Sequence, residues 1–360
     1  MKNTLPDTMK AVVCHGPGDY RLEEKPRPVA GKHEVVVRVK ACGICAGDVK
    51  ASMGAPMFWS GDDPWLKAPV VPGHEFVGIV VELGEGAAEY HNISLGDCVT
   101  AEQINPCGSC RFCRRGQYWM CEVHNIYGFQ KDVAEGGMSE FMLFHETARI
   151  HKIPDSLPLN DAVFIEPMAC AIHTVQRAKI EFDDVVVLAG AGPLGLGMVQ
   201  AIKLKTPKKL VVLDMDDKRL EMALNYGADA VFNPAQDDVV RLIRDMTDGY
   251  GCDVYIEATG NPKGVTQGLE MIRKLGRFVE FSVFGHETTA DWSVIGDRKE
   301  LEVLGAHLGP YCYEIAIDLF SRKLISAKDI VTHNFPIERF EEAFRIAASS
   351  ESIKTAIVIE

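Results

Sequence analysis

The sequence predicts an α/β protein in which a β-rich domain is combined with a doubly wound parallel sheet. Three observations predict this architecture: a β-rich stretch over residues 9–150, alternating apolar and helical segments from about residue 161, and a glycine-rich turn between one apolar run and a helix. Alternation of strands with helices is typical of a parallel sheet that carries helices on both faces. The chain has 360 residues, enough for two domains.

The first part of the chain is expected to form the β-rich domain. Pro and Gly interrupt it throughout, and the runs between them are rich in the β-branched residues that favour strands. These runs lie at residues 9–14, 34–41 and 76–83. We therefore expect a first domain over residues 1–160.

The central part is expected to form the parallel sheet, in a second domain over residues 161–307. Its six apolar runs lie at residues 184–189, 210–214, 230–232, 253–257, 277–283 and 301–305. The remaining segment, 308–360, contains an amphipathic helical pattern at 338–348 and a strand pattern at 355–359. We expect this segment to fold back onto the first domain.

A glycine-rich turn in the second domain has the spacing of a dinucleotide-binding fingerprint. An apolar strand runs into Gly190-x-Gly192-x-x-Gly195, and Pro193 and Leu194 open the helix that follows. Gly190 would form the turn, Gly192 would let a pyrophosphate approach the backbone, and Gly195 would let the helix pack against the strand. The helix N-terminus would attract the phosphates. The alternative is a structural glycine turn in another kind of α/β domain.

An acidic residue follows the next predicted strand. Asp214 lies 24 residues after Gly190, where a carboxylate would accept hydrogen bonds from the adenosine ribose. It would also repel a 2′-phosphate, and Asp216 and Asp217 add to that repulsion. The sequence therefore favours NAD over NADP, with Arg219 as a further contact to the same ribose.

Charge and composition argue against several classes of partner. The net charge is −13 and Lys and Arg form no run, which argues against binding to nucleic acid or to an anionic membrane. No apolar run approaches membrane-spanning length, and the N-terminus lacks the apolar core of a signal peptide. We expect a cytoplasmic protein whose 11 cysteines are metal ligands or buried thiols rather than disulfides.

Four cysteines lie close together in the first domain. Cys107, Cys110, Cys113 and Cys121 are separated by two, two and seven residues, so one local loop can close a tetrahedron around Zn²⁺. Four protein ligands leave no open position for a substrate, and such a zinc is structural. The alternative is a group of free thiols on an exposed loop.

A second set of candidate metal ligands is dispersed along the chain. It comprises Cys45, the adjacent pair His74 and Glu75, and Glu166. A catalytic zinc uses about three protein ligands and keeps a position open for water or substrate. Cys42 and Cys45 also form a Cys-x-x-Cys pair, which alone would fit redox chemistry. The dinucleotide-binding fingerprint and the four-cysteine loop elsewhere in the chain support the interpretation of this set as a catalytic zinc site.

With these motifs together, the chain resembles the zinc-dependent medium-chain dehydrogenases, the family of alcohol, sorbitol and threonine dehydrogenases. The resemblance implies a GroES-like catalytic domain built from both chain ends, with a Rossmann domain between them. It also implies reversible oxidation of a secondary alcohol by NAD, with one catalytic and one structural zinc per chain. The motifs that carry it are Gly43-Ile44-Cys45-x-x-Asp48, Gly73-His74-Glu75, the four-cysteine loop, Glu166-Pro167, the glycine-rich turn and Glu257-Ala258-Thr259-Gly260.

The resemblance assigns a role to each dispersed residue. Cys45 follows a Gly-Ile pair, as the family's zinc cysteine does, and His74 and Glu75 match an adjacent ligand pair. Glu166 matches a position where alcohol dehydrogenases carry a second cysteine and polyol dehydrogenases a glutamate. It therefore implies a polyol substrate and a zinc contact that is direct or made through water. Asp48 matches an acid that orients the histidine ligand.

Two positions depart from the family pattern. Many relatives carry a hydroxyl residue and a histidine that relay the proton, whereas this chain has Gly47 and Lys50. The proton path here is expected to use a water network through Glu166, assisted by Glu75, with Lys50 as a candidate late in the path. Gly47 also argues against a threonine dehydrogenase.

The segment between Cys45 and His74 is longer than in simple alcohol dehydrogenases of the family. Its Phe58 and Trp59 are candidates for the wall of a short substrate pocket; alternatively, they belong to a surface loop. With Trp65 they resemble the erythritol/L-threitol branch, so we expect oxidation of a four-carbon polyol. Longer sugar alcohols and L-threonine are alternatives, and a crystallin-like NAD-binding structural protein is the alternative outside enzymes. The resemblance also implies a homotetramer.

Overall fold

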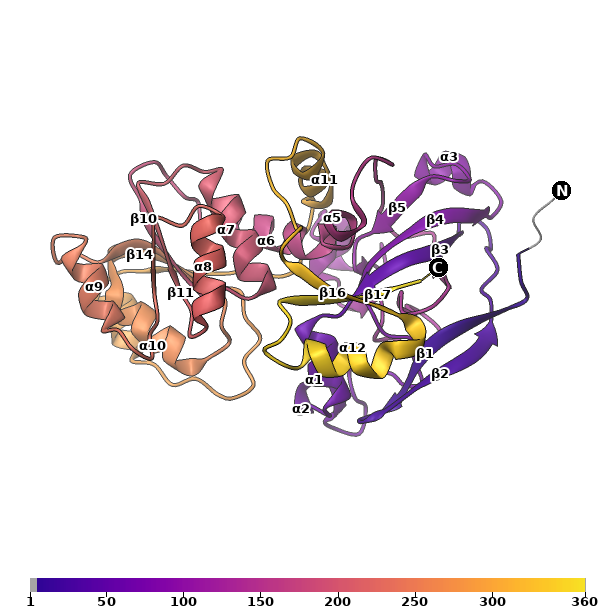
Figure 1. The fold of residues 1–360 in the computed structure, drawn as a ribbon, viewed down its shortest axis with the longest axis horizontal. Coiled ribbons are helices and arrows are strands. Elements are labelled where there is room, and N and C mark those ends of the chain that lie inside the picture. The colour runs from indigo at the N-terminus through magenta and orange to yellow at the C-terminus, as the bar shows by residue number, and fades with distance from the viewer. Residues whose placement is uncertain (1–4, 360) are drawn as a thin grey trace. The chain divides into compact units, whose positions relative to one another are not determined.

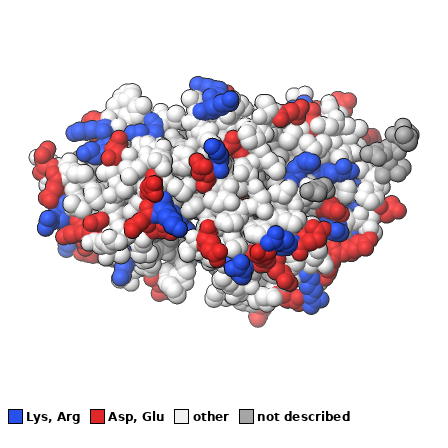
Figure 2. Space-filling view, viewed as in Figure 1, with Lys and Arg blue, Asp and Glu red and all other residues white. Residues whose placement is uncertain are grey.

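The computed structural model describes residues 5–359, and the chain divides into two compact units (Figure 1). The first unit combines Met1–Glu166 with Tyr313–Glu360, and the second is the continuous segment Pro167–Cys312. No helix within residues 5–359 has both the length and the apolar character needed to cross a membrane. Acidic and basic side chains are intermixed over the face shown in Figure 2.

The first unit is built on a seven-stranded sheet. Its order is β16-β17-β3-β4-β5-β9, and β8 also pairs with β3. Because β17 pairs antiparallel with β3, both ends of the chain contribute strands to one sheet. The strands are β3 (Val35–Gly43), β4 (Glu75–Leu83), β5 (Cys98–Ala101), β8 (Phe141–Phe144), β9 (Ile150–Lys152), β16 (Val331–Pro336) and β17 (Lys354–Val358).

Short helices and two small sheets complete the first unit. β1 (Thr8–Gly16) pairs with β2 (Asp19–Pro26), and β6 (Ile104–Asn105) pairs with β7 (Asn125–Ile126). The helices are α1 (Ala46–Ser52), α2 (Pro56–Trp59), α3 (Ala87–His91), α4 (Arg111–Arg114), η1 (Tyr118–Met120), α5 (Leu159–Val163), α11 (Tyr313–Ser321), η3 (Ile337–Arg339) and α12 (Phe340–Ala347).

The amphipathic helix expected near the end of the chain is α12. Its residues Phe340, Ala343 and Ile346 are buried at helical spacing and belong to the same core cluster as Val35 and Val37 of β3. An apolar stripe of this kind holds a surface helix on a sheet. The C-terminal segment is therefore part of the core of the first unit.

The second unit is a six-stranded parallel sheet in the order β12-β11-β10-β13-β14-β15. This is the strand order of a Rossmann fold, in which the direction of winding reverses beside the first strand. The strands are β10 (Val185–Ala189), β11 (Lys209–Leu213), β12 (Ala230–Phe232), β13 (Cys252–Glu257), β14 (Ile272–Glu280) and β15 (Glu302–Gly305). The helices are α6 (Ile165–Arg177), which begins at the unit boundary, α7 (Pro193–Lys203), α8 (Asp217–Asn225), α9 (Val239–Asp245), α10 (Pro262–Met271) and η2 (Val294–Arg298).

The expected fold class is confirmed, but individual strands differ from the expected runs. β14 begins at Ile272 and ends at Glu280, whereas the apolar run predicted a strand at 277–283; the half-buried Arg273 and the exposed Lys274 hide the true start. No strand was expected at β2, β5, β6, β7, β8, β9 or β16, and the side chains of β16 alternate between buried and more exposed and include His333 and Asn334.

Candidate active site

Three candidate metal ligands converge where β3 ends and β4 begins. Gly43 of β3 pairs with Glu75 of β4, so Cys45, just beyond β3, comes close to His74, just before β4. One ligand atom from each of Cys45, His74 and Glu75 lies within 4.8 Å of the others. A Cβ at position 43 would lie 2.1 Å from Oε2 of Glu75, so a larger residue there would displace this carboxylate.

Buried polar atoms without partners make this group a candidate metal site. Within residues 5–359, Oδ1 of Asp48, Nδ1 of His74 and Oε2 of Glu75 are buried and have no hydrogen-bond partner. Each such atom costs about 1–3 kcal/mol unless a ligand satisfies it. A thiolate, an imidazole and a carboxylate are donors that zinc accepts, so the residues present fit a catalytic zinc ion.

Asp48 links the cysteine to the histidine. It lies in the first turn of α1, where its Oδ2 accepts a hydrogen bond of 2.8 Å from the backbone N–H of Cys45. Its Oδ1 lies 3.8 Å from Nδ1 of His74. Burial lowers the pKa of His74, but the nearby Asp48, Cys45 and Glu166 outweigh it and raise this pKa to about 10. The excess of negative charge is what a dication at the site would neutralise.

Lys354 is a site residue that sequence analysis did not identify. It opens β17, and its Nζ donates hydrogen bonds to Oε1 of Glu75 and, at 3.1 Å, to the carbonyl oxygen of Ile44. Its exposed fraction is 5% and that of Glu75 is 2%. The available signal was a lysine directly before the apolar strand predicted at 355–359.

Glu166 lies near this group but outside it. It is in the first turn of α6, and among the described residues the group within 4.8 Å comprises Cys45, His74 and Glu75 without it. Its Oε1 accepts a hydrogen bond of 2.5 Å from Nε2 of Gln103, a second residue that sequence analysis did not identify. Gln103 directly follows the buried Glu102, and a polar pair after an apolar strand was the only available signal.

The expected pocket residues have different surroundings. Phe58 is buried and stacks on Phe129, with ring centroids 5.6 Å apart, and Phe129 lies 5.5 Å from the ring of His74. Trp59 instead donates a hydrogen bond of 2.8 Å from its indole to the carbonyl oxygen of Ala51 in α1. Phe58 thus belongs to an aromatic group beside His74, whereas Trp59 connects α2 to α1.

Gly47 keeps open the space between Cys45 and this aromatic group. A Cβ at position 47 would lie 3.8 Å from Sγ of Cys45 and 4.0 Å from Cζ of Phe58. A hydroxyl side chain, as many relatives have here, would therefore extend beside the thiol and the phenyl ring. In this chain Phe58 borders that space instead.

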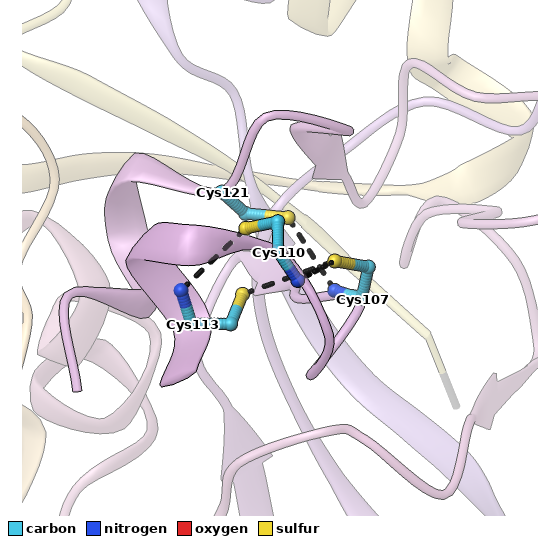
Figure 3. Close-up of side chains that lie close together, drawn as sticks. All are labelled: Cys107, Cys110, Cys113 and Cys121. Carbon is cyan, nitrogen blue, oxygen red and sulfur yellow. Dashed lines mark hydrogen bonds between the residues drawn. The ribbon is translucent and has the colours of Figure 1, made fainter. Parts of the chain in front are cut away.

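The four clustered cysteines converge in the first unit, with Cys110 capping α4. Figure 3 shows their side chains turned toward one another, and their sulfur atoms lie within 4.8 Å of one another. Sγ of Cys107 and Sγ of Cys113 are 4.0 Å apart. Two ligands of a tetrahedral zinc with 2.3 Å bonds would be about 3.8 Å apart, so the loop has close to the required dimensions.

Hydrogen bonds prepare this loop for metal. The backbone N–H groups of Cys107, Cys110 and Cys113 donate to the sulfur atoms of Cys121, Cys107 and Cys110, at 3.4, 3.3 and 3.5 Å. Hydrogen bonds from the side chain and backbone of Ser109 lower the pKa of Cys107 to about 6. Donors directed at sulfur favour the thiolate, which is the form that binds zinc.

The glycine-rich turn has the geometry of a dinucleotide cradle in the second unit. Gly190 has φ +104°, and a Cβ on it would lie 2.7 Å from the carbonyl oxygen of Ala258. A Cβ on Gly195 would lie 2.0 Å from the carbonyl oxygen of Gly190, so α7, which begins at Pro193, packs against the turn only with glycine there. Within the described chain, no atom lies within 4 Å of a Cβ built on Gly192. That open side fits a pyrophosphate.

Asp214 braces this turn from the end of β11. Its Oδ2 accepts a hydrogen bond of 2.7 Å from the N–H of Ala191, and its Oδ1 accepts one of 2.9 Å from the N–H of Asp216. Nε of Arg219 lies 4.0 Å from Oδ2 of Asp216. Asp217 accepts a hydrogen bond of 3.0 Å from the Asn233 side chain. The candidate ribose contacts therefore gather beside the fingerprint.

Comparison with known proteins agrees with both units. Residues 31–155 match the alcohol dehydrogenase GroES-like domain, and residues 193–322 match the zinc-binding dehydrogenase domain. The chain is 47% identical to the erythritol/L-threitol dehydrogenase of Mycolicibacterium smegmatis, over 99% of each chain. It is 33% identical to the sorbitol dehydrogenase of Halalkalibacterium halodurans, over 97% of this chain and 99% of the relative.

A solved structure gives the same result. An alcohol dehydrogenase from Escherichia coli CFT073, complexed with NADH, superposes with a TM-score of 0.87 and 26% identity. The alignment covers 98% of this chain and all of that one. The chain belongs to the zinc-dependent medium-chain dehydrogenase family.

Proposed function

We propose that this protein is a zinc- and NAD-dependent polyol dehydrogenase that oxidises a secondary hydroxyl of a four-carbon polyol, erythritol or threitol, to a ketose. The observation that carries the proposal is the buried group of Cys45, His74 and Glu75, whose unpartnered polar atoms fit a catalytic zinc. The presence of Cys45, His74 and Glu166 argues against a crystallin-like relative without activity.

The chain's own residues have distinct tasks in this proposal. A bound zinc supplies Lewis acidity, which lowers the pKa of a substrate hydroxyl, and NAD supplies the hydride acceptor. Cys45, His74 and Glu75 would hold the metal, with Glu166 as a further ligand, direct or through water. Asp48 orients His74 by the carboxylate oxygen that lies 3.8 Å from Nδ1.

The proton released from the substrate hydroxyl needs another path, because this chain lacks the hydroxyl residue and the histidine that relay it in many relatives. Gly47 carries no hydroxyl, so we assign the first step of this path to the carboxylate of Glu166, assisted by Glu75. Both side chains are nearly buried, at 6% and 2% exposure. Lys50, which is partly exposed, is the candidate for a later step.

Phe58 supports the choice of a short substrate. Its ring lies in the aromatic group beside His74 and borders the space kept open by Gly47. A substrate pocket walled by Phe58 would be short, and it would suit a four-carbon chain better than a six-carbon chain. The identity with an erythritol/L-threitol dehydrogenase supports the same choice.

The finer cofactor and assembly assignments are also proposals. Asp214, Asp216 and Asp217 beside the glycine-rich turn favour NAD over NADP. The two cysteine-containing groups support one catalytic and one structural zinc per chain. The family resemblance supports a homotetramer, and 11 free cysteines suit a reducing compartment such as the cytoplasm.

A substrate panel tests this function. NADH formation from NAD is followed with erythritol, L- and D-threitol, ribitol, xylitol, sorbitol, L-threonine and ethanol. We expect kcat/KM to be highest for a tetritol. Turnover of L-threonine alone would contradict the polyol assignment, and turnover of ethanol above all polyols would contradict the role given to Glu166.

A further inference from the structure

Gln103 contacts the carboxylate that distinguishes this site from that of a simple alcohol dehydrogenase. Its Nε2 donates a hydrogen bond of 2.5 Å to Oε1 of Glu166, and both side chains are 6% exposed. Hydrogen bonds to an ionised acceptor are about twice as strong as neutral ones. The amide therefore restricts the rotamers of Glu166 more than packing alone would.

The backbone of Gln103 is itself fixed on both sides. Its N–H donates a hydrogen bond of 3.2 Å to the hydroxyl of Tyr313, and its carbonyl oxygen accepts one of 2.9 Å from the N–H of Tyr127. Both tyrosines are fully buried. The donor amide is thus attached to a backbone that has little freedom to move.

The preceding residue joins this backbone to the four-cysteine loop. Oε2 of Glu102 accepts a hydrogen bond of 2.6 Å from the hydroxyl of Tyr118, which lies in the loop between Cys113 and Cys121. Oε1 of Glu102 accepts one of 3.0 Å from Nε of Arg149, whose guanidinium covers the Tyr118 ring at 4.2 Å. The dipeptide Glu102-Gln103 therefore connects the metal-binding loop to Glu166.

Glu166 in turn is the further zinc ligand of the proposed function, direct or through water. It lies in the first turn of α6, and its side chain is nearly buried. A shift of its carboxylate would therefore change the field and the geometry that the ligand group presents. Residues that orient a metal site's ligands typically contribute about 10–100-fold in affinity or activity.

We propose that Gln103 is a positioning residue that holds the Glu166 carboxylate toward the zinc-ligand group, anchored through Glu102 to the four-cysteine loop. This inference rests on the proposed function, since it assumes that Glu166 takes part in the zinc site. It adds a residue that acts through Glu166 and does not itself touch substrate or cofactor.

A double-mutant cycle tests the inference in the full-length holoenzyme. Gln103→Met removes the donor at nearly constant size, and we expect kcat/KM for the best polyol to fall about 10–100-fold. In a Glu166→Ala background the same substitution is expected to change kcat/KM by less than about twofold. Gln103→Glu, which places a second carboxylate against Glu166, is expected to reduce kcat/KM at least as much as Gln103→Met.

Asn105→Leu is the matched control. Asn105 lies two residues away, is 6% exposed and accepts a hydrogen bond of 2.5 Å from the hydroxyl of Thr147, so the control removes a buried polar contact that does not include Glu166. In the cobalt(II)-substituted enzyme, the visible absorption of the catalytic metal is expected to change in Gln103→Met and to match wild type in Asn105→Leu.

Two outcomes would overturn the positioning role. One is an equal loss of kcat/KM from Gln103→Met with and without Glu166, which would indicate a general structural effect. The other is wild-type kcat/KM together with a wild-type cobalt spectrum in Gln103→Met. Failure of the proposed function is recognised separately, because wild-type enzyme would then show no polyol turnover and Glu166→Ala would lose nothing.

Discussion

The ammonium group of Lys354 donates a hydrogen bond to the carboxylate of Glu75, and both side chains are at least 95% buried. The two residues are 279 positions apart in the chain. The pair holds one oxygen of Glu75 and leaves Oε2 without a partner among residues 5–359. One oxygen of the Glu75 carboxylate thus binds the Lys354 ammonium group, and the other is available to the proposed zinc.

Replacement of this lysine should destabilise the first unit strongly. Lys354→Met leaves the Glu75 carboxylate buried without its cation, and loss of one partner of a buried pair costs about 3–5 kcal/mol. The free energy of unfolding in urea, at equal zinc content, measures the effect. Lys203→Met is the control, since its pair with Asp229 is about one-third exposed and should contribute less than about 1 kcal/mol. Equal losses in the two variants would contradict a buried-pair role.

Asp48→Asn should weaken metal binding without unfolding the protein. The amide can keep one acceptor for the N–H of Cys45, but it lacks the charge that orients His74. We expect zinc to be lost to a chelator about 10–100-fold more readily. Asp238→Asn, which alters the N-cap of α9 in the second unit, should retain zinc as wild type does. Equal retention in both variants would show that Asp48 has only a capping role.

Cys113→Ser should remove the structural zinc selectively. Metal analysis is expected to fall from two zinc ions per chain to one, because a hydroxyl replaces one of four thiolates. The thermal unfolding midpoint should fall by about 5 °C or more, given about 2–4 °C per kcal/mol in a domain of this size. Cys98→Ser, at a partly buried thiol outside both cysteine groups, should keep two zinc ions. A content of two in Cys113→Ser would contradict the four-cysteine site.

Asp214→Ala should reduce the preference for NAD over NADP. The substitution removes the carboxylate beside the glycine-rich turn that would repel a 2′-phosphate. We expect the ratio of kcat/KM for NAD to that for NADP to fall at least about tenfold. Glu221→Gln removes one charge from an exposed position on α8 and should leave this ratio unchanged. A similar change in both variants would indicate a general effect of charge.

Glu280 should make the second unit less stable as the pH rises. It pairs with Glu257 across β14 and β13, and burial, followed by the charge of Glu257, raises its pKa from 4.5 to about 7. The unfolded chain ionises this group first, so its contribution to stability is present below about pH 4.5 and is lost as the pH rises toward 7. Glu280→Gln should therefore gain unfolding free energy over wild type at pH 8 but not at pH 4.5. A pH-independent difference between the two proteins would contradict this linkage.

The fold was largely predictable because its signals are local. Most strands of the parallel sheet are short apolar runs. Gly195 is required by a contact within the turn itself, and Gly190 has a positive φ there. β16 was missed because its alternating pattern, with Asn334 and His333 on the strand, lacks an apolar run.

The candidate site was predictable only in part. The paired strands β3 and β4 bring together the motifs that contain Cys45, His74 and Glu75. Motifs that identify these residues in the sequence therefore also indicate which residues meet in space. Lys354 and Gln103 approach the site only through tertiary packing, at 279 positions from Glu75 and 63 from Glu166, and neither belongs to a local motif. Phe58 lies in the aromatic group beside His74, and Trp59 contacts α1. These directions depend on side-chain packing, which the hydrophobic periodicity of the sequence does not predict.

The pairing of β17 with β3 also sets an order of events during synthesis. Residue 75 leaves the ribosome 279 residues before residue 354. At about 5–20 residues per second, this interval lasts roughly 15–55 s. The whole second unit, Pro167–Cys312, is translated within it and is free to fold first. During this interval the residues of β3 that pair with β17 have no partner strand, and Glu75 lacks its lysine. Unpaired strand edges favour misfolding, so the first unit is exposed to it until β17 is made.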